Sequence, residues 1–111
     1  MTQLLISVKN VEESLIARYA DVDVIELKNP AAGALGALDT DIVSKIIQEV
    51  KGSAFISATV GEGHDSVDAL VADIKLYADL GVDVVKMSVS DLFSEENFFT
   101  EMLQLTTQGI K

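Results

Sequence analysis

Short apolar runs alternate along the chain with longer segments whose apolar residues recur every three or four positions. The short runs are rich in β-branched residues, as buried strands are, and the longer segments have the spacing of amphipathic helices. The pattern predicts strands at Leu4–Val8, Val24–Leu27, Phe55–Val60 and Val84–Met87, and helices at Val11–Tyr19, Thr40–Val50, Val67–Leu80 and Glu96–Thr107. The last three residues, Gly109 to Lys111, are expected to stop the final helix and begin a fifth strand.

Each predicted helix carries one apolar face that we expect to pack inward. The four faces consist of Val11, Leu15, Ile16 and Tyr19; Ile42, Val43, Ile46, Ile47 and Val50; Leu70, Val71, Ile74 and Tyr77; and Phe98, Phe99, Met102 and Leu103.

Strict alternation of strand and helix predicts an α/β fold, a parallel sheet covered by helices. Four units in 111 residues give roughly 28 residues per unit, a length typical of (β/α) barrels, in which eight units take about 250 residues. We therefore predict a single domain over residues 1–111, a (β/α)4 unit that amounts to half a barrel. An open flavodoxin-like sheet is the alternative, because alternation alone fits both.

A partial repeat favours the barrel. Tyr19-Ala20-Asp21 recurs as Tyr77-Ala78-Asp79, and Val22-Asp23-Val24 recurs as Val82-Asp83-Val84, at offsets of 58 and 60 residues. These offsets equal two βα units, the repeat expected of a barrel that arose by duplication. Coincidence among common residues is the competing explanation.

The composition of the chain limits the partners, the compartment and the ligands that we expect. The formal net charge is −10, which disfavours nucleic acid and anionic membranes as partners. The chain has no cysteine, and neither a run of about 20 apolar residues nor a signal peptide is recognisable, so we expect a cytoplasmic protein. The lone His64 is expected to be a loop residue, and we expect no metal ion and no cofactor.

The stretch VDVIELKNPAAGALG, residues 22–36, holds the main candidate for chemistry. Lys28 ends an apolar strand, where a charge is costly unless it is paired or the amine is neutral. A neutral lysine amine is a nucleophile. Lys86 similarly ends the fourth predicted strand, and the carboxyl ends of parallel strands form the functional face of such folds.

Polar residues accompany both lysines on alternate positions of the strands. Side chains two residues apart share a face, so Glu26 lies with Lys28 and Ser88 with Lys86, while Ser7, Ser57 and Thr59 end the remaining strands. A single lysine at the end of an apolar strand would be explained without a site, because its long side chain lets the ammonium group reach solvent. Two lysines with several hydroxyl groups favour a site, in which Glu26 either moves protons or forms an ion pair with Lys28.

Four segments together resemble the (5-formylfuran-3-yl)methyl phosphate synthase family of methanofuran biosynthesis. They are Glu26-Leu27-Lys28-Asn29-Pro30, Gly33 to Ala37, Ser57-Ala58-Thr59-Val60-Gly61-Glu62, and Gly81-Val82-Asp83-Val84-Val85-Lys86. The resemblance runs in order from Leu4 to Lys86 and covers the N-terminal half of the family only. Met87-Ser88-Val89-Ser90 departs from it, standing where the family has a glycine-containing loop.

The resemblance implies a TIM-barrel lyase that forms a Schiff base. Such enzymes condense two molecules of glyceraldehyde 3-phosphate to a furan aldehyde phosphate. The imine-forming lysine falls on Lys28 and the second active-site lysine on Lys86. We expect the substrate, a small phosphorylated aldehyde or ketone, to contact Ser7, Glu26, Asn29, Ser57 and Thr59.

Family members are longer than this chain, and their second half carries further site residues. The chain is accordingly either a fragment of a longer barrel or a half-barrel that forms a homo-oligomer or pairs with a second half. A non-catalytic half-barrel, which binds a phosphorylated ligand without turnover, is the alternative function.

Overall fold

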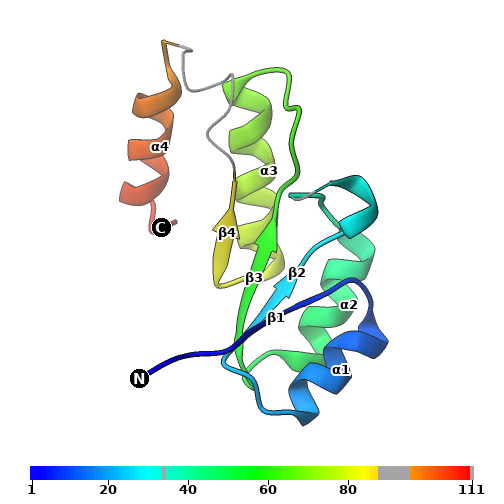
Figure 1. Ribbon diagram of the computed structural model, residues 1–111. Coiled ribbons are helices and arrows are strands. Elements are labelled where there is room, and N and C mark those ends of the chain that lie inside the picture. The colour runs from blue at the N-terminus through cyan, green and yellow to red at the C-terminus, as the bar shows by residue number, and fades with distance from the viewer. Residues whose placement is uncertain (34, 88–95, 111) are drawn as a thin grey trace.

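The computed structural model describes residues 1–33, 35–87 and 96–110 and shows helices and strands in alternation (Figure 1). Its elements are β1 (Leu5–Val8), α1 (Val11–Tyr19), β2 (Val24–Leu27), the 3-10 turn η1 (Pro30–Ala32), α2 (Thr40–Val50), β3 (Phe55–Thr59), α3 (Val67–Leu80), β4 (Val84–Lys86) and α4 (Phe98–Thr107). The predicted alternation is confirmed, with α4 beginning two residues later than expected.

The four strands form one parallel sheet in the order β1-β2-β3-β4. In a flavodoxin-like sheet the first strand lies inside the sheet and not at its edge. The consecutive order therefore supports the predicted (β/α)4 unit and excludes the flavodoxin-like alternative. Right-handed crossovers between consecutive strands place α1, α2 and α3 on the same face of the sheet, and each helix packs against the next along the chain. Within the described residues β1 and β4 remain the two edges of an open sheet, and no barrel closes.

One face of the sheet supplies the core. Ile25 and Leu27 of β2 and Ile56 and Ala58 of β3 are fully buried beneath the helices. The predicted inward faces of α2 and α3 are confirmed by the burial of Val43, Ile46, Ile47, Val50, Leu70, Val71, Ile74 and Tyr77. The opposite face of the sheet, referred to below as the inner face, is therefore left for a site.

The predicted inward face of α1 is wrong except for Val11, which is partly buried against the core. Ile16 and Tyr19 are 70% and 94% exposed, and Leu15 is 41% exposed, whereas the buried residues of this helix are Ser14 and Ala17. Small side chains let α1 approach β1 and α2 closely, and its larger apolar residues Leu15, Ile16 and Tyr19 remain exposed.

Helix α4 also differs in part from the expectation. Phe98 and Leu105 are buried, but Phe99 and Leu103 are 63% and 66% exposed, because α4 packs mainly along α3. The expected fifth strand is not formed at Ile110, whose backbone N–H instead bonds the carbonyl of Leu105 at the end of α4. Lys111 lies outside the described residues.

The repeated Val-Asp-Val segments make equivalent connections. A carboxylate oxygen of Asp23, which precedes β2, accepts the backbone N–H of Leu4 at 2.6 Å. A carboxylate oxygen of Asp83, which precedes β4, accepts the N–H of Ile56 at 2.9 Å. Each aspartate thus fastens its strand to the start of the preceding one.

None of the helices in the described part of the chain is both long and apolar enough to cross a membrane.

Candidate active site

The register of the sheet sets the two lysines level with each other at its carboxyl edge. Lys86 pairs with Thr59, and Leu27 pairs with Ala58, so Lys28, one residue beyond Leu27, lies level with Thr59 on its other side. The backbone N–H of Lys28 still donates to the Val8 carbonyl at 3.0 Å, which continues the pairing with β1. The lysines are two strand spacings apart, which puts their backbones roughly 10 Å apart.

Two residues before Lys28 on β2, the buried carboxylate of Glu26 connects β2 with β1 and β4. Ser7, Glu26 and Ser57 pair across β1, β2 and β3. The Ser7 hydroxyl donates to Glu26 Oε2 at 2.8 Å, and Lys86 Nζ donates to Glu26 Oε1 at 3.2 Å. The Glu26 side chain is only 6% exposed, so the charge of the Lys86 ammonium group compensates a carboxylate that has little access to water.

The ion pair of Glu26 is therefore with Lys86 and not with Lys28, the partner considered from sequence. Glu26 lies on β2 and Lys28 directly follows the end of that strand, but Lys86 reaches the carboxylate from across β3. The Lys86 side chain is 48% exposed, so one side of its ammonium group faces solvent.

Lys28 takes no part in this ion pair. It is half-buried and lines a hollow of about 300 Å³ together with Ser7, Glu13 and Pro30. Within residues 1–33, 35–87 and 96–110 its ammonium group forms no ion pair. A lysine amine in this position can act as a nucleophile when it is neutral.

Two of the predicted substrate-binding side chains hold the loop that follows β2. Asn29 Oδ1 accepts the N–H of Ala31 at 3.1 Å and so caps η1. The Thr59 hydroxyl, fully buried, donates to the carbonyl of Gly36 at 2.7 Å. Ser57 lies beside Glu26 and is 6% exposed, and Ser88 lies outside the described residues.

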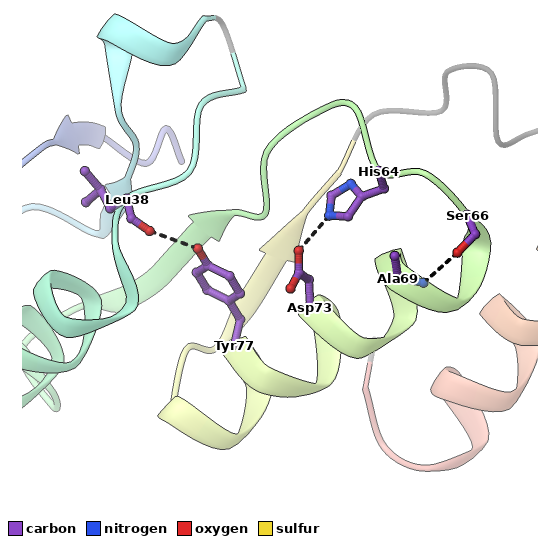
Figure 2. Close-up of polar contacts among 6 residues, drawn as sticks. All are labelled: Leu38, His64, Ser66, Ala69, Asp73 and Tyr77. Carbon is purple, nitrogen blue, oxygen red and sulfur yellow. Dashed lines mark hydrogen bonds and ion pairs between the residues drawn. The ribbon is translucent and has the colours of Figure 1, made fainter.

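Sequence reasoning missed a second polar cluster beside the same loops, which Figure 2 shows on one side of α3. His64 Nε2 lies 2.7 Å from Asp73 Oδ2, and one turn further along α3 the Tyr77 hydroxyl donates to the Leu38 carbonyl at 3.2 Å. Burial raises the pKa of the Tyr77 phenol, and the negative charges of Asp73 and Asp39 add to this effect. The spacing of Asp73 and Tyr77 by four residues is the only local signal of the cluster in the sequence.

The fold and the site together define a class: a parallel α/β protein that carries two lysines at the carboxyl edge of its sheet, one of them bound to a buried glutamate. The family model described as 4-HFC-P synthase matches residues 4–111. The chain belongs to this family.

Individual relatives agree with the family match. A putative (5-formylfuran-3-yl)methyl phosphate synthase of Methylorubrum extorquens is 40% identical over 87 residues, which are 78% of this chain and 36% of the relative. The (5-formylfuran-3-yl)methyl phosphate synthases of Methanosarcina barkeri and Methanocaldococcus jannaschii are 32% and 30% identical over 98% and 97% of this chain and 46% of their own length. The chain thus spans less than half the length of these relatives.

Proposed function

We propose that this chain carries the imine-forming part of a (5-formylfuran-3-yl)methyl phosphate synthase, with Lys28 as the nucleophile. The reaction is the condensation of two molecules of glyceraldehyde 3-phosphate to a furan aldehyde phosphate, with the release of one phosphate and two molecules of water. The observation that carries the proposal is the placement of Lys28 and Lys86 level with each other at the carboxyl edge, with only Lys86 bound to Glu26.

The first step fits the chemistry of these side chains. The neutral amine of Lys28 attacks the carbonyl carbon of the triose phosphate, and the resulting carbinolamine loses water to give an imine. The protonated imine then withdraws electrons from the neighbouring carbon, so that a proton can leave that carbon and a new carbon–carbon bond can form.

Lys86 supports this step from across the sheet. Its ammonium group can donate a hydrogen bond to the substrate phosphate or to the departing hydroxyl group, and Glu26 fixes its position. The Ser7 hydroxyl fixes the other oxygen of the carboxylate, so the three side chains form one continuous polar connection.

Reduction with borohydride tests the proposal. Glyceraldehyde 3-phosphate and borohydride are expected to add the reduced triose phosphate to the peptide that contains Lys28 and to no other peptide. Lys28→Ala is expected to abolish the labelling because it removes the amine. Lys28→Arg is expected to abolish it as well, because a guanidinium group does not lose its proton. Lys45→Ala, which removes an exposed lysine of α2, is the matched control and is labelled like the unmodified chain.

Equal labelling of the Lys28→Ala variant would show that another amine forms the adduct. Labelling of Lys28 without release of a furan product would support the alternative function, a half-barrel that binds the phosphorylated ligand without turnover.

A further inference from the structure

We infer that Thr59 is a positioning residue that fixes the backbone beside Lys28 by holding the carbonyl group of Gly36. The inference rests on the proposed function of Lys28, and it gives Thr59 a different role from the substrate contact expected from sequence. The bond that carries it is the 2.7 Å hydrogen bond from the Thr59 hydroxyl to the Gly36 carbonyl oxygen.

The Gly36 carbonyl closes the loop that begins at Lys28. The same oxygen accepts the backbone N–H of Asn29 at 2.9 Å, so two donors from different elements meet on one acceptor. One donor follows Lys28 directly in the chain, and the other belongs to β3. Lys28 is thereby linked to the adjacent strand through its neighbour Asn29.

The backbone packs closely where this connection is made. A Cβ atom added at Gly36 would lie 2.1 Å from the Asn29 carbonyl oxygen and 2.8 Å from the Cβ of Ala32. Glycine is therefore required for the two ends of the loop to meet. The turn η1 lies between them and is itself capped by the Asn29 side chain.

The loop is held again just beyond this point. The buried hydroxyl group of Tyr77 donates to the carbonyl of Leu38, two residues after Gly36 (Figure 2). Both anchors are buried hydroxyl groups that donate to loop carbonyls, but only the Thr59 bond shares its acceptor with the residue next to Lys28.

Thr59 also lies level with the two lysines. It pairs directly with Lys86 and stands one strand from Lys28, yet its side chain is fully buried. The donated hydrogen of its hydroxyl group is already committed to Gly36. This position suits a residue that sets the spacing between the lysines without contacting the substrate.

Hydrogen exchange at the Asn29 amide tests the inference directly. Thr59→Val replaces the hydroxyl by a methyl group and is expected to speed exchange at Asn29 roughly three- to tenfold, the change that corresponds to the loss of one neutral hydrogen bond. Thr59→Ser keeps the hydroxyl and is expected to retain slow exchange. Ser14→Ala, which removes a fully buried hydroxyl bonded to the Val11 carbonyl in α1, is the matched control and leaves Asn29 unchanged.

Trapping of the imine gives the second readout. Thr59→Val is expected to slow borohydride-dependent labelling of Lys28 by a similar factor, with recovery in Thr59→Ser and no change in Ser14→Ala. If the unmodified chain is not labelled at Lys28, the proposed function fails, while exchange at Asn29 still decides whether Thr59 fixes the loop.

Exchange at Asn29 as slow in Thr59→Val as in the unmodified chain would overturn the inference. Acceleration of the core amides of Ile56 and Ala58 to the same extent would also overturn it, because the effect would then be global unfolding. If Thr59→Val does not fold, Thr59→Cys, whose thiol is a weak donor of similar size, replaces it with the same two readouts and the same criteria.

Discussion

At the scale of single residues, the site depends on how a buried carboxylate is compensated. Glu26 has almost no contact with solvent, and its two oxygens are occupied by a hydroxyl group from one side and an ammonium group from the other. Removing one partner leaves a charge that water solvates poorly, whereas removing both charges together leaves no such penalty.

A double-mutant cycle between Glu26 and Lys86 measures this compensation. Lys86→Met is expected to lower the free energy of unfolding by about 1 kcal/mol, less than for a fully buried pair because the Lys86 side chain is half exposed. Combined with Glu26→Gln, the same change is expected to cost much less, which gives a coupling energy of about 1 kcal/mol in urea denaturation.

Lys75→Met is the control for this cycle, because Lys75 is an exposed lysine of α3. Additive effects of Glu26→Gln and Lys86→Met would mean that the contact contributes nothing to stability.

Sequence alone predicts the members of this site but only part of their pairing. Alternation along a strand correctly places Glu26 and Lys86 on the inner face, because side-chain direction is a local property. The partner of Glu26 depends on the register between β2, β3 and β4, which no local pattern encodes. The bond from Thr59 to Gly36 joins residues 23 positions apart and was missed for the same reason.

At the scale of elements, the two aspartates before β2 and β4 are expected to differ in importance although they form equivalent bonds. Asp83→Ala leaves the N–H of Ile56 without its acceptor at a buried residue, which is expected to cost about 1–3 kcal/mol. Asp23→Ala frees the N–H of Leu4, an exposed residue where water replaces the carboxylate, and is expected to cost about 0.5 kcal/mol.

Urea denaturation checks both values, with Asp79→Ala, an exposed position of α3, as the control of similar charge change. Equal costs at Asp23 and Asp83 would contradict the argument from burial.

The anchor between α3 and the loop before α2 is expected to weaken in alkaline solution. The pKa of Tyr77 is raised above 10.0 by burial and by Asp73 and Asp39. In the window between 10.0 and the raised value the unfolded chain has lost the phenolic proton and the folded chain retains it. The contribution of Tyr77 to the free energy of unfolding is therefore fully present below about pH 10. It declines as the pH rises through this window, by at most about 1.4 kcal/mol per pH unit.

Unfolding in urea at several alkaline pH values tests this sign. Tyr77→Phe is expected to decline less steeply above about pH 10 than the unmodified chain. Tyr19→Phe removes the other tyrosine, which is 94% exposed, and is expected to leave the profile unchanged. Parallel profiles for the Tyr77→Phe variant and the unmodified chain would contradict the assignment.

The sequence predicts the elements themselves well, and their faces less well. In α2 and α3 apolar residues at helical spacing are buried as expected, because both helices have neighbours on each side. In α1 the same spacing misleads, since Ile16 and Tyr19 lie exposed beside the open edge of the sheet. Helical spacing of apolar residues identifies a face that is suited to packing. It does not show whether another element of the described chain packs against that face.

At the scale of the whole molecule, exposed apolar groups gather at the first edge and on the inner face. Leu4, Ile6 and Ile16 line a hollow of about 390 Å³ beside β1. On the inner face Leu5 and Phe55 are 47% and 60% exposed. Open edges and exposed apolar surface of this kind favour association with another chain.

We propose that two copies pair around a two-fold axis, with β1 of each meeting β4 of the other. Sedimentation equilibrium at micromolar concentration is expected to give twice the mass of the chain. Ile16→Lys places a charge in the hollow beside β1 and is expected to shift the equilibrium to the monomer with little effect on stability, because Ile16 is 70% exposed. Leu76→Lys, a similar change at a 42% exposed residue of α3, is the control that remains paired. A stable species with the mass of one chain would rule out the pairing, since the first edge and the inner face would then persist in water uncovered.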